Sequence, residues 1–211
     1  MIIESGSFEE TNAKYLEDVT NALCLLEETC QRYSKSDMDS LLNEYHDSIV
    51  GMNLGFGLTN ICKNGFDCRD DKGNFLECKT SSFDNNNWNA TFNDTTEEKA
   101  ETFKSSNIFV SLSIWLGVKT PLCVAVGNNP KIGDYLLEKV KSHKENKTVR
   151  STQSISFSTL LFKYGFKIVV LGGHSKEKVL DVLKNKNSSF KKLSLDDILY
   201  PEEWIEIKNR I

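Results

Sequence analysis

Three short apolar runs in the second half of the chain constrain the fold more than any other feature. They cover residues 108–115, 122–126 and 166–171, are partly β-branched, and have the length of buried β-strands. Segments with helical periodicity lie between and after them, at 132–143, 156–164 and 176–185. Strands and helices mixed in this order predict an α/β (α+β) fold, with a central mixed β-sheet flanked by helices.

The first hundred residues predict three further helices and a loop. In residues 11–33, apolar side chains recur every three or four positions, at Leu16, Val19, Leu23, Leu26 and Cys30. Asp39 is placed to cap a second helix, in which Glu44 lies beside the apolar face. Three glycines predict a loop over residues 51–60, and a charged helix is expected at 95–105.

The length of 211 residues predicts one domain, 1–211, with an acidic helical part (1–50), a hairpin (64–82) and a basic part (139–192). The first residues of the sequence lack the basic and apolar segments of a signal peptide, and no apolar stretch is long enough to span a bilayer. The six cysteines form no CxxC pair, which indicates reduced thiols rather than a zinc site. We therefore expect a soluble, intracellular protein without a membrane partner, located in the cytoplasm or associated with the nucleoid.

Charge is distributed unevenly along the chain. The net charge is only −4, but residues 139–192 carry thirteen Lys and Arg against three acids, whereas residues 1–50 carry three basic groups against eleven acids. The basic segment can hold phosphates by Coulomb attraction and counterion release. The alternative is a solvated lysine-rich surface with no ligand.

The segment NGFDCRDDKGNFLECKTSS, residues 64–82, predicts a β-hairpin around the turn RDDKGN. Because side chains alternate along a strand, Glu77 and Lys79 share one face, and Leu76, Cys78 and Thr80 share the other. We expect the first face to carry chemistry and the second to be core. The alternative is that Glu77 and Lys79 form only a surface charge pattern.

The length of the turn decides where Asp67 lies. An odd-length loop with Gly73 in a left-handed conformation sets Asp67 opposite Glu77, with Cβ atoms about 5 Å apart. A two-residue turn at Lys72-Gly73 would instead direct Asp67 to the core side. Two carboxylates this close repel each other unless a hard divalent cation lies between them. The odd-length turn therefore predicts a metal site beside Lys79.

This pattern resembles the PD-(D/E)xK nuclease superfamily over roughly residues 39–115. Asp67, which follows Gly65-Phe66, matches the first acid, and Glu77-Cys78-Lys79 matches the (D/E)-x-K element. Phe66 stands where the motif has proline. Glu44 on the preceding helix matches the extra upstream acid of many members, although Asp39 or Asp47 can fill the same role.

The resemblance implies a restriction-endonuclease-like core and a Mg²⁺-dependent endonuclease that cuts double-stranded DNA, of the type II restriction class and working as a homodimer. In that interpretation Asp67, Glu77, the Cys78 backbone carbonyl and Glu44 hold Mg²⁺, for which Mn²⁺ can substitute, and Lys79 positions the attacking water. The alternatives are a DNA repair or junction-resolving nuclease, or a catalytically silent nucleic-acid-binding module.

Candidate DNA contacts lie outside the motif. Asparagine amides suit adenine edges, so the tract after the hairpin is a candidate for base reading, at Asn86, Asn87, Trp88 and Asn89. Trp88 is of a type found more often in a core. In the basic segment, candidate DNA contacts are Lys147, Arg150, Gln153 and Ser154.

Overall fold

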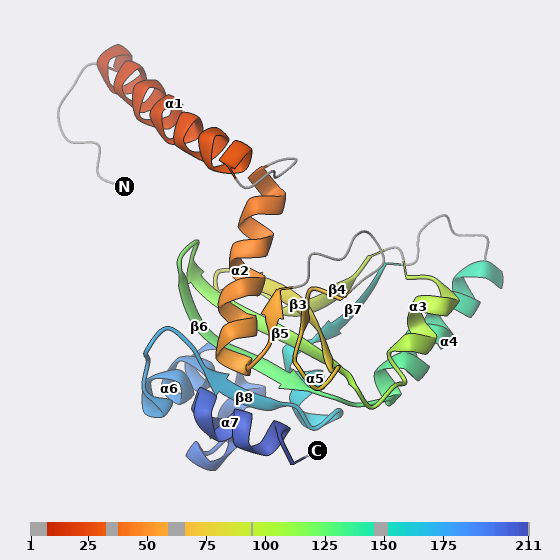
Figure 1. Cartoon of the computed structure of the whole chain (residues 1–211). Coiled ribbons are helices and arrows are strands. Elements are labelled where there is room, and N and C mark those ends of the chain that lie inside the picture. Colours follow the sequence, from red (N-terminus) through yellow and green to blue (C-terminus); the bar gives the residue numbers. More distant parts are fainter. Residues whose placement is uncertain (1–7, 33–37, 59–65, 94, 146–151, 211) are drawn as a thin grey trace. The chain divides into compact units, whose positions relative to one another are not determined.

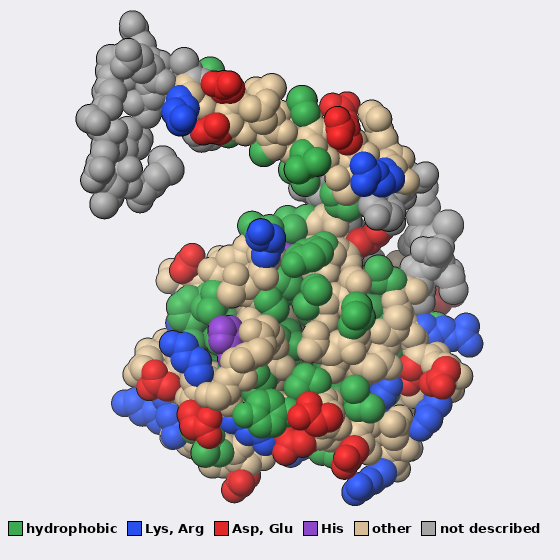
Figure 2. Space-filling model, turned by 60° about the vertical axis from the view of Figure 1, so that its left-hand side comes forward, with side chains coloured by type: hydrophobic (Ala, Val, Ile, Leu, Met, Phe, Trp, Pro, Cys, Tyr) green, Lys and Arg blue, Asp and Glu red, His purple; other side chains and the backbone are tan. Residues whose placement is uncertain are grey.

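The computed structural model describes residues 8–32, 38–58, 66–93, 95–145 and 152–210. The chain forms two compact units, Met1–Tyr45 and His46–Ile211. The first unit contains helix α1 (Phe8–Arg32) and the start of helix α2 (Met38–Leu54), which confirms the two predicted helices. Apolar side chains on α1 are exposed beside acidic ones, as Figure 2 shows, among them Leu16, Leu23 and Leu26.

The second unit is built on a seven-stranded mixed sheet (Figure 1). Its strands, in the order β1-β2-β3-β5-β6-β8-β9, are β1 (Gly57–Leu58), β2 (Cys68–Arg69), β3 (Phe75–Ser82), β5 (Ile108–Gly117), β6 (Thr120–Gly127), β8 (Lys167–Val170) and β9 (Ile198–Leu199). The β3–β5 and β8–β9 pairs are parallel and the other neighbours are antiparallel. The expected mixed sheet and its three apolar core strands, β5, β6 and β8, are confirmed.

Helices cover both faces of this sheet. One face packs against α3 (Glu97–Thr102), α4 (Lys131–Glu145), α5 (Phe157–Phe162), α6 (Lys176–Lys186) and a two-stranded sheet of β4 (Asn89–Phe92) and β7 (Gln153–Ser156). The other face packs against the end of α2 and against α7 (Pro201–Lys208). Short 3-10 helices cover Ser188–Lys192 and Leu195–Asp197. No helix in the described residues has both the length and the apolar character needed to cross a membrane.

The expected loop over residues 51–60 is wrong where α2 continues through Gly51 to Leu54 and where β1 covers Gly57–Leu58, and residues 59–60 lie outside the described residues. A Cβ atom at Gly51 would lie 2.8 Å from the Cys68 sulfur, so this glycine allows the helix to approach β2 closely. The helix stops at Gly55, whose φ is +74°. Gly51 therefore permits close packing of the helix, and Gly55, four residues later, ends it.

Strands β4 and β7 and helix α7 were not predicted. The asparagine-rich tract conceals a short alternating pattern in which Ala90 and Phe92 are buried while Asn89 and Thr91 are less so. β4 finds its hydrogen-bonding partner β7 more than sixty residues later, with Ala90 opposite Ile155. A strand of four residues carries too weak a periodicity to be recognised without its partner.

Candidate active site

The hairpin register is the predicted one. Cys68 pairs with Leu76 and Arg69 with Phe75, around a five-residue turn in which Gly73 has φ +84°. The pairing ends at Cys68, and the carboxylate of the preceding residue, Asp67, bonds the backbone of Cys78. The odd-length turn is therefore confirmed, and the alternative two-residue turn is wrong.

Asp70 holds this turn in place. Its carboxylate accepts hydrogen bonds from the backbone N–H groups of Lys72 and Asn74, and the buried Lys208 of α7 donates to it at 2.9 Å. Burial raises the pKa of Asp70, but the hydrogen bonds of Asn74 and Lys208 outweigh burial and lower the pKa to about 2. The turn that sets the register is thus tied to the C-terminal helix by a buried ion pair.

Glu77 lies in a buried ion cluster. Its side chain is 3% exposed, and Oε1 accepts from the Nζ of Lys79 at 2.8 Å and from the Nζ of Lys99 at 3.3 Å. Lys99 comes from α3, whose first turn is capped by the Thr96 side chain. Sequence reasoning missed Lys99, because a lysine in a charged helix gives no signal of the strand that it will reach.

Lys79 is a cation in this site. Burial lowers the pKa of Lys79, but the neighbouring carboxylates of Glu77 and Asp67 more than compensate, and the pKa is raised above its ordinary value. Its Nζ also lies 5.5 Å from the centre of the Phe92 ring on β4. Lys79 can therefore orient and neutralise anionic groups at neutral pH, whereas a proton-accepting role is ruled out by its charge.

Asp67 lies at the edge of β3. Its Oδ2 accepts the backbone N–H of Cys78 at 2.7 Å. Burial raises the pKa of Asp67, and the charge of Glu77 raises it further. The Cys78 N–H, Lys79 and Lys99 act in the opposite direction without cancelling the increase. A second negative charge here is unfavourable in the protein alone, and a bound cation would relieve that cost.

The Cys78 carbonyl faces the same strand edge as Asp67. In a β-strand the N–H and C=O of one residue point to the same side, and the N–H of Cys78 points to Asp67. A backbone oxygen and a carboxylate therefore converge at this edge, in the combination that hard divalent cations accept.

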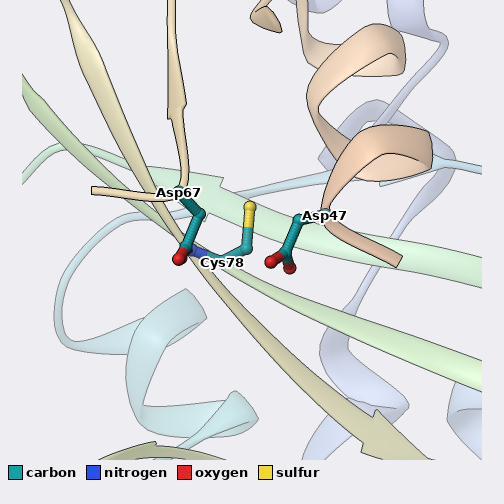
Figure 3. Close-up of side chains that lie close together, drawn as sticks. All are labelled: Asp47, Asp67 and Cys78. Atoms are coloured by element: carbon teal, nitrogen blue, oxygen red, sulfur yellow. Dashed lines mark hydrogen bonds between the residues drawn. The ribbon is translucent and has the colours of Figure 1, made fainter. Parts of the chain in front are cut away.

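The upstream acid that joins the hairpin is Asp47. A carboxylate oxygen of Asp47, one of Asp67 and the sulfur of Cys78 lie within 4.8 Å of one another, with Asp47 reaching in from α2 on the apolar face of β3 (Figure 3). Asp47 was one of the alternatives to Glu44 in the sequence. Glu44 itself belongs to the Met1–Tyr45 unit, whereas the hairpin belongs to the His46–Ile211 unit.

Both faces of β3 are covered. Leu76 and Cys78 pack with Val50 and Leu54 of α2, as expected for the core face. The face of Glu77 and Lys79 is not open either, because β4 and α3 lie over it and bring Phe92 and Lys99 into contact with it. As expected, one face of β3 carries charged residues and the other carries apolar ones. Contrary to expectation, the charged face is covered as well.

The four asparagine-tract residues expected to contact DNA all line one cavity: Asn86, Asn87, Trp88 and Asn89. Trp88 is 5% exposed and donates its indole N–H to the Phe83 carbonyl, so its ring belongs to the core and forms one wall of this cavity.

Two of the other predicted DNA contacts lie on β7, the strand that pairs with β4 after this tract. Gln153 is buried on β7, Ser154 is exposed on the same strand, and Lys147 and Arg150 lie outside the described residues. The basic segment as a whole runs through α4, β7, α5, β8 and α6. Its charge is therefore distributed over several elements and does not form a single helix face.

Comparison with known proteins adds no assignment to this geometry: no protein-family model matches the chain, and no curated protein does.

Proposed function

We propose that this protein is a metal-dependent endonuclease that hydrolyses phosphodiester bonds of double-stranded DNA, of the site-specific restriction type. The observation that carries the proposal is the hairpin register, which brings Asp67, Glu77 and the backbone of Cys78 to one strand, with Lys79 bonded to Glu77. A helix, an antiparallel hairpin, a second helix and a strand parallel to the hairpin follow in order, as α2, β2–β3, α3 and β5. This order supports a restriction-endonuclease-like core.

The donor set suits Mg²⁺, or Mn²⁺ in its place. Asp67, Glu77 and the Cys78 carbonyl would hold the ion. Asp47, which lies beside Asp67 and the Cys78 sulfur rather than beside Glu77, replaces Glu44 as the upstream acid. The ligands named for the ion are all oxygen donors, which Mg²⁺ prefers, and the raised pKa of Asp67 fits a carboxylate that lacks its counter-charge. When bound, such an ion polarises the phosphate and activates water as a nucleophile.

The side chains supply orientation and charge. Lys79 and Lys99 converge on Glu77 and present two ammonium groups near the position of a scissile phosphate, where they offset the negative charge that grows in the transition state. Packing of Phe92 beside Lys79 fixes the direction of that ammonium group. Double-stranded DNA as substrate and a homodimer as the working form are part of this proposal.

A plasmid assay tests it. Supercoiled DNA is incubated with the protein and Mg²⁺, and in parallel with EDTA, and we expect discrete linear fragments only with Mg²⁺. Glu77→Gln should remove this cleavage, whereas Glu98→Gln, an exposed acid on α3, should not. Nicking or preferential cutting of branched DNA would identify a repair or junction-resolving nuclease instead.

One observation favours a second candidate, a catalytically silent nucleic-acid-binding module. Glu77 is already compensated by two lysines, which reduces its need for a metal ion. A thermal shift separates the two: Mg²⁺ should raise the melting temperature of a metal-binding enzyme by mass action, but not that of the Asp67→Asn/Glu77→Gln double variant. Equal shifts, or none, together with DNA binding and no cutting, would support the silent module.

A further inference from the structure

A cavity of about 150 Å³ lies where the turn before β4, the start of α5 and the end of α6 meet (these elements are labelled in Figure 1). Four asparagines, two serines, three aromatic residues and one lysine line it, and none of these described residues is a carboxylate. Its volume is below the roughly 300–1,000 Å³ of a site for a whole small molecule. It therefore suits a single small group rather than a complete cofactor.

Lys186, at the end of α6, provides the charge of this cavity. Its Nζ donates to the Phe83 carbonyl at 2.7 Å and lies 4.7 Å and 5.5 Å from the ring centres of Phe83 and Trp88. Within the part of the chain that the structure describes, no carboxylate forms an ion pair with it. An ammonium group has three donors, so a fixed cation keeps hydrogen-bonding capacity for an anion.

The remaining polar groups are mostly donors or can act as donors. Ser158 lies in the first turn of α5, and Ser156 caps that helix. The side-chain oxygen of Asn187 already accepts the N–H of Ser189, which leaves its amide NH₂ for another partner. Asn86 and Asn87 add two further amides at the exposed rim. A cation surrounded by hydroxyl and amide donors, without an acid, is complementary to an oxyanion such as phosphate.

We propose that this cavity is a phosphate subsite that holds a backbone phosphodiester of DNA. This rests on the proposed function and changes the role of the asparagine tract from base reading to phosphate binding. Phe83 follows Glu77 by six residues along the β3 direction, which is about 20 Å at the usual rise of a strand. Along a duplex that distance corresponds to about six base pairs, so the subsite anchors DNA away from the cut.

The test measures binding of a fluorescent DNA duplex in EDTA, as a function of salt, so that cleavage does not enter. Lys186→Met should weaken binding about tenfold and flatten the slope of log affinity against log salt by about one. Lys184→Met is the matched control, because Lys184 lies in the same last helical turn but does not line the cavity. Equal behaviour of the two variants would overturn the proposal.

Lys186 also packs on two rings, so a second variant covers the case in which Lys186→Met fails to fold. Ser158→Asp puts a carboxylate at the cavity, at a position in the first helical turn where an acid favours the helix. It should weaken duplex binding more than tenfold with an unchanged melting temperature. Wild-type affinity for this variant would contradict the subsite.

The source of the phosphate is tested separately. A duplex with a neutral methylphosphonate at one position is scanned along the strand. At one position, the methylphosphonate should weaken binding of the duplex to the wild type but not to Lys186→Met. If inorganic phosphate alone quenches the tryptophan fluorescence of the wild type but not that of Lys186→Met, and no scanned position matters, the cavity holds a free anion and the DNA assignment is wrong. Failure of plasmid cleavage would affect only the enzyme proposal, since every measurement here is of binding.

Discussion

Both faces of strand β3 contain buried residues, but the two are stabilised in opposite ways. Leu76 and Cys78 lie among apolar side chains of α2 and the sheet, whereas Glu77 is enclosed by two lysines. The first arrangement gains free energy from apolar burial. The second must recover the cost of burying charge through its partners. Burial alone therefore does not separate core from site, but the partners of the buried groups do.

The largest expected effect concerns the charged face. Glu77→Gln should reduce the rate of plasmid cleavage about a thousandfold, because it removes a candidate metal-binding charge and the partner of both lysines. Cys78→Ala on the opposite face keeps the backbone carbonyl and should stay within about tenfold of the wild-type rate. Rates of both variants would be measured at saturating Mg²⁺. Similar losses in both would show that the two faces are not functionally distinct.

The apolar face should respond in stability instead. Leu76 is fully buried, and Leu76→Ala should lower the free energy of unfolding by about 3 kcal/mol through lost burial and the cavity left behind. Urea unfolding measures this, with Thr80→Ala, an exposed position on the same strand face, as control. The cleavage rate per folded molecule should be unchanged. Loss of activity in the folded fraction would mean that Leu76 supports the site directly.

The turn that aligns the two faces should be sensitive to acid. The pKa of Asp70 is lowered to about 2, so its contribution is present above the unfolded-state pKa of about 4 and is lost as pH falls from about 4 to 2. Asp70→Asn should cost about 2 kcal/mol at pH 7, with Lys208 left buried. Its unfolding free energy should converge with that of the wild type near pH 2. A pH-independent difference would exclude the ion pair as the cause.

The smallest effect should be a gain in stability at the site. Because the pKa of Asp67 is raised, its ionisation destabilises the folded protein at neutral pH. Asp67→Asn keeps an acceptor oxygen for the Cys78 N–H and should raise the melting temperature by a few degrees at pH 7 without divalent ions. At pH 3, where the wild-type carboxyl is protonated, the gain should disappear. A loss of stability at pH 7 would indicate that Asp67 is a structural acid.

Patterns within a few residues were readable from the sequence. The faces of β3 follow from alternation along the strand, and the pairing of Cys68 with Leu76 follows from a five-residue turn with a glycine at its left-handed position. The apolar spacing of α1 and the three core strands were readable for the same reason. Each depends on dihedral preferences and periodicity, which neighbouring residues determine together.

Contacts between distant segments required the tertiary structure. Lys99 reaches Glu77 across 22 residues, and Lys186 reaches the Phe83 carbonyl across 103. Asp47 meets Asp67 because Gly51 lets α2 approach β2, and β4 exists as a strand because β7 pairs with it. A lysine or a short polar segment is compatible with many surroundings. The packing of helices against the sheet determines which surroundings each such residue has, because packing depends on apolar burial summed over the whole unit.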